Sequence, residues 1–212
     1  MTTPSVIDLL GVLAYGELTS FERTTQGAAL APTLADKVTL AAVAAREYAN
    51  FERLCGHLQA NGVDPLEAMQ PFVKPLNDFH ANLEARNWLE GLMKSYVGDG
   101  IAADFYREIS MYLDVETTNL VIDVLSDTTL ADFALEQVKA AIAQDPKIAG
   151  RLALWGRRMM GEMISQATVV AGSRPALQEL FLGSVNAAEL AGLVNKLTVA
   201  HARRMDQIGL AS

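Results

Sequence analysis

Four acidic residues are the strongest candidates for chemistry in this sequence. Each interrupts a run of apolar residues that recur at steps of three and four, the spacing of one buried helix face. They are Glu17, Glu47, Asp99 and Asp127. Four carboxylates gathered in a dry core cannot all stay ionised, because burial and mutual repulsion both disfavour the charged form. The pattern therefore predicts that a metal cation, shared protons or a buried arginine compensates them.

An internal repeat relates these acids in pairs. The stretch AYGELTSFER resembles YVGDGIAADFYRE and aligns Glu17 with Asp99, while REYANFERL resembles SDTTLADFAL and aligns Glu47 with Asp127. The two acids of the first predicted hairpin are 30 residues apart (47 − 17), and those of the second are 28 residues apart (127 − 99). The identity is low but the spacing agrees. The repeat predicts two helical hairpins with one acid on each helix.

The residues one turn after Glu47 and Asp127 bear on whether the site binds a metal and on which metal it would bind. In di-iron carboxylate bundles, two helices each supply a Glu and the other two each supply Glu-x-x-His. The histidine positions of that pattern hold Asn50 and Leu130 here. Leucine cannot ligate a metal, and an asparagine carbonyl suits calcium or magnesium better than iron. Its NH₂ group can donate to a carboxylate. We therefore expect a degenerate site with no cofactor or a redox-inert cation.

The elements that must position these residues are helices. Apolar residues recur at helical steps along nearly the whole chain, and alternation at period two is absent over useful lengths. Thr3–Pro4, Pro32–Thr33 and Asp145–Pro146 predict helix starts, and Asn61–Gly62 predicts a helix end. Pro71 and Pro75 predict a broken connection over residues 65–84. The long helices are expected over residues 4–25, 33–61, 87–113, 114–144, 145–172 and 186–207.

This arrangement predicts an all-α fold in a single domain spanning residues 1–212. Two antiparallel hairpins joined by a long crossover form a ferritin-like four-helix bundle. Two or three accessory helices follow at the C-terminal end. Their apolar faces favour a homodimer.

Composition limits the classes of function. A net charge of −8 and a pI of about 4.9 argue against a nucleic-acid binder, which usually carries a basic patch. The lone Cys55 fits a reducing compartment. No apolar run is long enough for a membrane span, and the first residues lack the basic region of a signal peptide. We expect a cytoplasmic protein.

Other motifs have ordinary structural interpretations. The histidines His57, His80 and His201 are expected at the surface or at helix ends. The glycines of AYG and VGDG are expected to allow close helix approach or a local π-bulge, not a phosphate loop, because no Lys-Ser/Thr follows them.

The chain resembles a known family over about residues 5–208. The stretches AYGELTSFER, APTLADK, YVGDGIAADFYRE and GRLALWGRRMMGEMISQA resemble actinobacterial ferritin-like proteins related to the tRNA isopentenyladenosine hydroxylases. The resemblance implies a ferritin-like bundle. The hydroxylase relatives use a di-iron centre and dioxygen to hydroxylate a modified adenosine in tRNA. By this resemblance, the four acids are the metal carboxylates.

Two hypotheses follow from the resemblance and the departures from it. In the first, the chain is a ferritin-like protein whose metal site is degenerate and which has no oxygenase activity. In the alternative, it is a di-iron monooxygenase, an oxidoreductase that acts on a modified tRNA adenosine or on another substrate. Asn50 and Leu130 favour the first.

Overall fold

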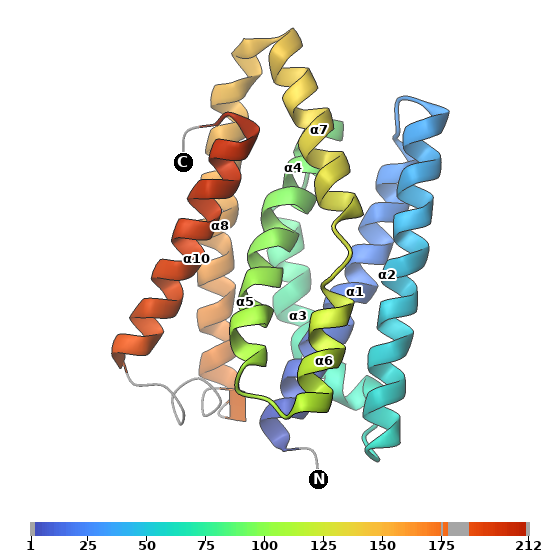
Figure 1. Cartoon of the computed structure of the whole chain (residues 1–212), viewed down its shortest axis with the longest axis vertical. Helices are drawn as coiled ribbons and strands as arrows, with labels where there is room; N and C mark the ends of the chain where they lie inside the picture. The colour runs from blue at the N-terminus through green and yellow to red at the C-terminus, as the bar shows by residue number, and fades with distance from the viewer. Residues whose placement is uncertain (1–2, 175, 178–186, 211–212) are drawn as a thin grey trace. The chain divides into compact units, whose positions relative to one another are not determined.

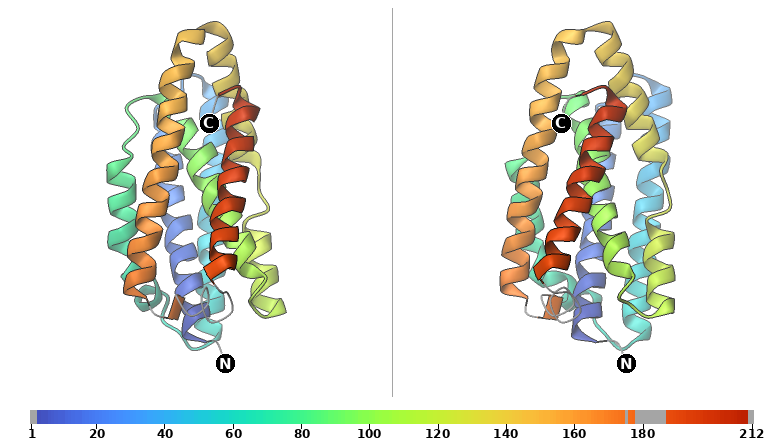
Figure 2. Two further views of the ribbon diagram at one scale, coloured as in Figure 1. Left: turned by 90° about the vertical axis from the view of Figure 1, so that its left-hand side faces the viewer. Right: turned by 60° about the vertical axis from the view of Figure 1, so that its left-hand side comes forward.

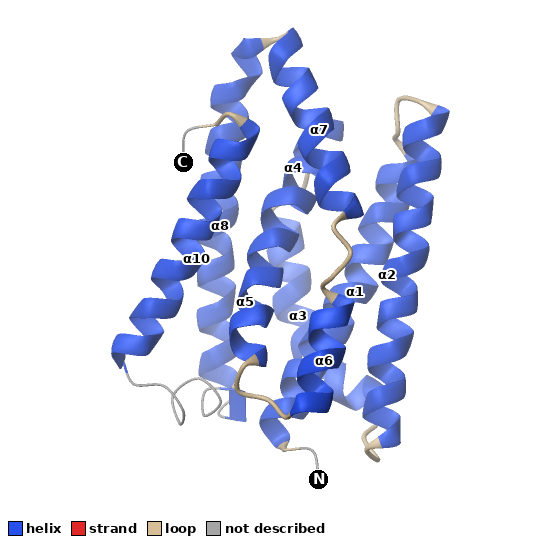
Figure 3. Cartoon of the chain, viewed as in Figure 1, coloured by secondary structure: helices blue, strands red, loops and turns tan. Residues whose placement is uncertain are grey.

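The computed structural model describes residues 3–174, 176–177 and 187–210, and its regular structure in these ranges is helical without any strand (Figure 3). The chain divides into two compact units, Met1–Asn82 with Gln166–Gly183 and Leu83–Ser165 with Ser184–Ser212. The all-α prediction is confirmed. The expectation of a single domain stays a prediction.

The first unit is built on a hairpin of two long helices, α1 (Pro4–Ala29) and α2 (Leu34–Ala60), which lie side by side (Figure 1). The threonine before each helix caps it, since Thr3 accepts from the N–H of Val6 and Thr33 from that of Asp36. Both predicted starts are confirmed. The end of α2 is also confirmed, because Gly62 has a φ of 75°.

The third helix of this unit corrects a prediction. Helix α3 (Pro65–Asn82) is continuous through Pro71 and Pro75, although these prolines predicted a broken segment. Each proline removes one backbone hydrogen bond and costs about 3 kcal/mol in a helix interior. Packing of α3 against α1 offsets this cost in free energy. Phe72 is fully buried, and Ala68 and Met69 are nearly so. The free energy gained by burying this face exceeds the local tendency of the two prolines to break the helix.

The second unit begins with a helical run in three parts. These are α4 (Trp88–Met93), a π-helical turn η1 (Lys94–Asp99) and α5 (Gly100–Ser110). Asn87 caps α4 by accepting from the N–H of Glu90. The predicted helix over 87–113 is therefore confirmed, with a π turn inside it. Helix α10 (Ala187–Ile208) runs beside α5 (Figure 2).

The predicted continuous helix over 114–144 is wrong in its middle. The structure has α6 (Val115–Val124) and α7 (Thr129–Gln144), separated by four residues. In this gap Ser126 donates to the carbonyl of Asp123 at 2.7 Å, and the N–H of Thr129 donates to the Asp127 carboxylate at 2.8 Å. Side chains of Ser, Asp and Thr compete in this way with helical hydrogen bonds.

The C-terminal part follows the predicted order. A short 3-10 turn, η2 (Pro146–Ile148), leads into α8 (Ala149–Ser173), so the predicted start at Asp145–Pro146 is confirmed. The last predicted helix is confirmed as α10. A short helix predicted from Arg174–Pro175 falls mainly outside the described residues. None of the described helices is long and apolar enough to cross a membrane.

Candidate metal site

Glu17 and Asn50 form the first contact of the candidate site. Glu17 lies on α1, and Asn50 lies on α2 one turn after Glu47; all three side chains are half-buried. The Asn50 amide donates to Glu17 Oε2 at 3.4 Å, a long hydrogen bond. The prediction that this amide donates to a carboxylate is confirmed. At the position expected for a histidine ligand, the chain supplies a neutral donor to Glu17.

Glu47 is held by hydroxyl groups of the facing helix. Ser20 Oγ donates to Glu47 Oε1 at 2.6 Å, and Thr24 Oγ1 donates to the same oxygen at 3.2 Å. Ser20 and Thr24 follow Glu17 on α1 at steps of three and four, so they share its face. Hydrogen bonds from hydroxyl groups to a carboxylate favour its ionised form.

A basic pair extends this network. Arg23 Nη2 donates to Ser20 Oγ at 3.3 Å, and Arg23 Nη1 lies 3.2 Å from His80 Nδ1 on α3. A guanidinium group can only donate, so His80 Nδ1 is the acceptor in this hydrogen bond. The first unit therefore links Glu47 to Arg23 through Ser20. Ser20, Thr24 and Arg23 were not predicted from the sequence as members of this network. The signal that could have found Ser20 and Thr24 is their helical spacing from Glu17, which puts them on the face of α1 that Glu17 occupies.

Asp99 lies at the end of the π-helical turn η1. Its side chain is half-buried, and the turn covers the VGDG motif up to this residue. The expected π-bulge is thus confirmed at VGDG. The AYG motif lies in regular helix, and a Cβ added to Gly16 would meet no atom within 4 Å. Neither a bulge nor a close approach is present there.

Asp127 is not on a buried helix face. It is exposed in the turn between α6 and α7, where it accepts from the backbone N–H of Thr129. The apolar stripe that placed it inward assumed a continuous helix, and that helix is broken here. Leu130, the second expected histidine position, is half-buried in the first turn of α7.

The four predicted carboxylates are thus divided between the units. Glu17 and Glu47 belong to the first unit, and Asp99 and Asp127 belong to the second. No group of three or more His, Cys, Asp or Glu side chains suited to a metal ion occurs in the part of the chain that the structure describes. A common site for all four acids stays a prediction.

The histidines differ from expectation at one position. His57 and His80 lie in the last turns of their helices, as expected. His201 is buried in α10 instead of being at the surface, and neither ring nitrogen has a hydrogen-bond partner among the described residues. Burial, with a further contribution from Arg204, lowers the pKa of His201 below its ordinary value. The arginines at 203 and 204 favour a solvated face in the sequence, but the apolar stripe of α10 buries His201.

Comparison with known families bears on this arrangement. The sequence profile of a family described as "Ferritin-like domain, actinomycetes" matches residues 2–184. The chain belongs to this family. The match confirms the ferritin-like fold class predicted from the helix order. No curated protein matches the chain, so a relationship to tRNA hydroxylases stays a prediction.

Proposed function

We propose that this ferritin-like protein has a degenerate metal site and catalyses no oxygenase reaction. One observation supports the proposal most directly: both candidate carboxylates of the first unit accept hydrogen bonds from side chains of the protein itself. Glu17 accepts from Asn50, and Glu47 accepts from Ser20 and Thr24. The protein would then act as a binding or scaffolding bundle.

The residues present fit a di-iron centre poorly. Such a centre in a carboxylate bundle draws one histidine from each of two helices. An amide and an aliphatic side chain occupy those positions in Asn50 and Leu130. Glu47 Oε1, the oxygen a metal would use, already accepts from two hydroxyl donors, of which Ser20 Oγ lies 2.6 Å away. The donor set suits either no metal or a redox-inert cation that prefers oxygen ligands.

A second candidate function retains metal chemistry. The chain would be a di-iron monooxygenase acting on a modified tRNA adenosine or on another substrate. The π-helical turn that ends at Asp99 favours it, because π turns within helices are frequent at functional sites. The net charge of −8 weighs against tRNA as the substrate.

Restoring the missing ligands tests the proposal. The variant with Asn50→His and Leu130→His should bind Fe(II) more tightly than the wild type, measured by anaerobic titration calorimetry. A matched control is Asn61→His, which adds a histidine at the exposed end of α2. Oxygen uptake after Fe(II) addition should be no faster for the wild type than for buffer. Protein-dependent oxygen uptake by the wild type would overturn the proposal in favour of the monooxygenase.

A further inference from the structure

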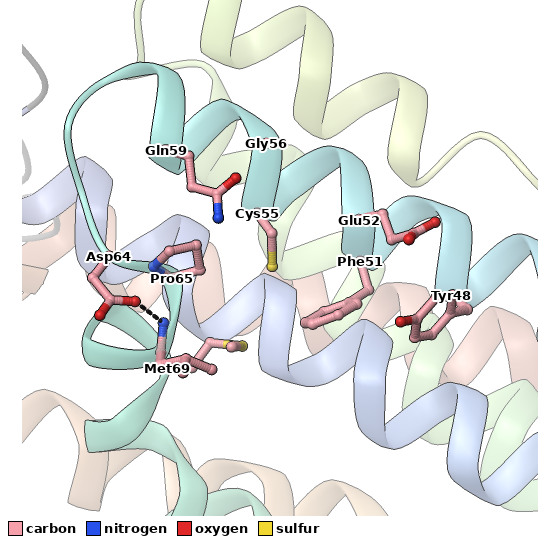
Figure 4. Close-up of a pocket in the computed structure, with 10 residues that line it drawn as sticks. Tyr48, Phe51, Glu52, Cys55, Gly56, Gln59, Asp64, Pro65 and Met69 are labelled. Atoms are coloured by element: carbon pink, nitrogen blue, oxygen red, sulfur yellow. Dashed lines mark hydrogen bonds between the residues drawn. The ribbon is translucent and has the colours of Figure 1, made fainter.

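A cavity of about 420 Å³ lies between the second half of α2 and the start of α3, both in the first unit. Its middle is apolar. Figure 4 shows Phe51 and Cys55 on the α2 side and Met69 on the α3 side. Met69 is buried, and Phe51 and Cys55 are half-buried. Small-molecule sites in proteins are mostly apolar cavities of this size with a few polar groups that orient the ligand.

The charged side chains that line this cavity are all acidic. They are Glu52 on α2 and Asp64 directly before α3, and none of the described lysines, arginines or histidines lines it. Burial and, after it, the charge of Glu52 raise the pKa of the Cys55 thiol, so the field of this carboxylate acts inside the cavity. A cavity that carries charge of one sign attracts a ligand of the opposite sign.

The two carboxylates lie at opposite ends of the apolar middle. In Figure 4, Asp64 lies beside the turn that leads into α3, Glu52 lies further back along α2, and Cys55 lies between them. Asp64 Oδ1 accepts from the N–H of Leu66 at 2.9 Å, and its second oxygen can accept from a ligand. The unit charge of this carboxylate exceeds the positive charge of about half a unit at a helix N-terminus. Each end of the cavity therefore offers an acceptor for one positive charge.

We propose that this cavity binds a linear aliphatic diamine in its doubly protonated form. One ammonium group pairs with Glu52 and the other with Asp64, and the methylene chain between them covers the apolar middle. Tyr48 lines the Glu52 end and is 40% exposed, so its ring can contact the first ammonium group as well. A lysine side chain of another protein carries a single ammonium group and would satisfy only one end.

Titration calorimetry of the full chain at low salt tests the two-ended ligand. The probes are the terminal diamines of butane, hexane and octane, each compared with the monoamine and the diol of the same chain length. The best diamine should bind at least about threefold more tightly than its monoamine, because it forms a second exposed ion pair. The diol should bind more weakly than either. A monoamine that binds as tightly as the diamine, the result expected for a site that takes a lysine side chain, overturns the proposal, and so does the absence of binding by every diamine.

Removing one charge at a time tests the two ends. Glu52→Gln and Asp64→Asn should each weaken diamine binding by about threefold, and the double variant should bind diamine and monoamine equally. Asparagine caps helices as well as aspartate does, so Asp64→Asn keeps the start of α3, and circular dichroism confirms that each variant is folded. The control is Glu67→Gln, which removes an exposed acid in the first turn of α3 that does not line the cavity. Affinity should be unchanged in this control, whereas an equal loss there would show attraction to the acidic surface in general and overturn the cavity as the site.

Discussion

The contact between α1 and α3 gives a prediction whose size follows from one distance. A Cβ added to Gly11 would lie 2.3 Å from the backbone carbonyl oxygen of Ala68. Overpacking costs about 1–3 kcal/mol in general, and the upper part of this range, about 2–3 kcal/mol, applies here because a backbone carbonyl cannot rotate away as a flexible side chain can. Replacing glycine by alanine inside a helix gains about 0.8–1.0 kcal/mol. We therefore expect Gly11→Ala to destabilise the protein by about 1–2 kcal/mol.

Gly16, on the same helix, supplies the matched control. Its surroundings are open, so Gly16→Ala should keep the full helix gain of about 0.8–1.0 kcal/mol. Thermal unfolding followed by circular dichroism measures both variants. One kcal/mol corresponds to about 2–4 °C in a chain of this size, so Tm should fall by about 2–8 °C for Gly11→Ala and rise by about 2–4 °C for Gly16→Ala. Equal shifts, or a more stable Gly11→Ala variant, would refute the close α1–α3 contact.

Three further predictions concern buried polar groups. Arg174→Leu leaves the buried Asp8 carboxylate without its ion pair and should lower the free energy of unfolding by about 2–3 kcal/mol, a value kept modest because the arginine side chain is 36% exposed. Urea unfolding measures this loss, and adding Asp8→Asn should recover most of it. Ser20→Ala should cost about 1.5 kcal/mol by removing a donor to Glu47, and a double-mutant cycle with Glu47→Gln should show that the effects are not additive. His201 has a lowered pKa in the folded state, so as the pH falls below about 6.5 the unfolded chain takes up a proton first and the free energy of unfolding decreases. His201→Phe should flatten this dependence of the free energy of unfolding on pH. An unchanged dependence would contradict the burial of His201.

The fold could be predicted where local chemistry determines it. Thr3, Thr33 and Asp114 each cap a helix, as their residue types and the following residues indicate. Prediction was wrong where tertiary packing or competing side-chain hydrogen bonds decide the outcome. The packed face of α3 keeps the helix continuous through Pro71, and the side chains around Asp127 interrupt the helix predicted there.

The candidate site could be predicted in part. Helical spacing placed Glu17 on a face toward α2, and the donor role of Asn50 followed from its amide. The partners of Glu47 were missed, because isolated hydroxyl residues are common in helices and carry no distinctive pattern. Only the packing of α1 on α2 shows which hydroxyl groups reach the carboxylate.

The metal content of the full chain tests the degenerate site most directly. The protein would be produced in iron-supplemented medium, purified without an affinity metal and measured by elemental mass spectrometry. Because Asn50, Ser20 and Thr24 already donate to the candidate ligands, we predict iron far below one equivalent per chain. Iron at the stoichiometry of a di-iron centre would contradict this account and would require ligands other than the four acids predicted here.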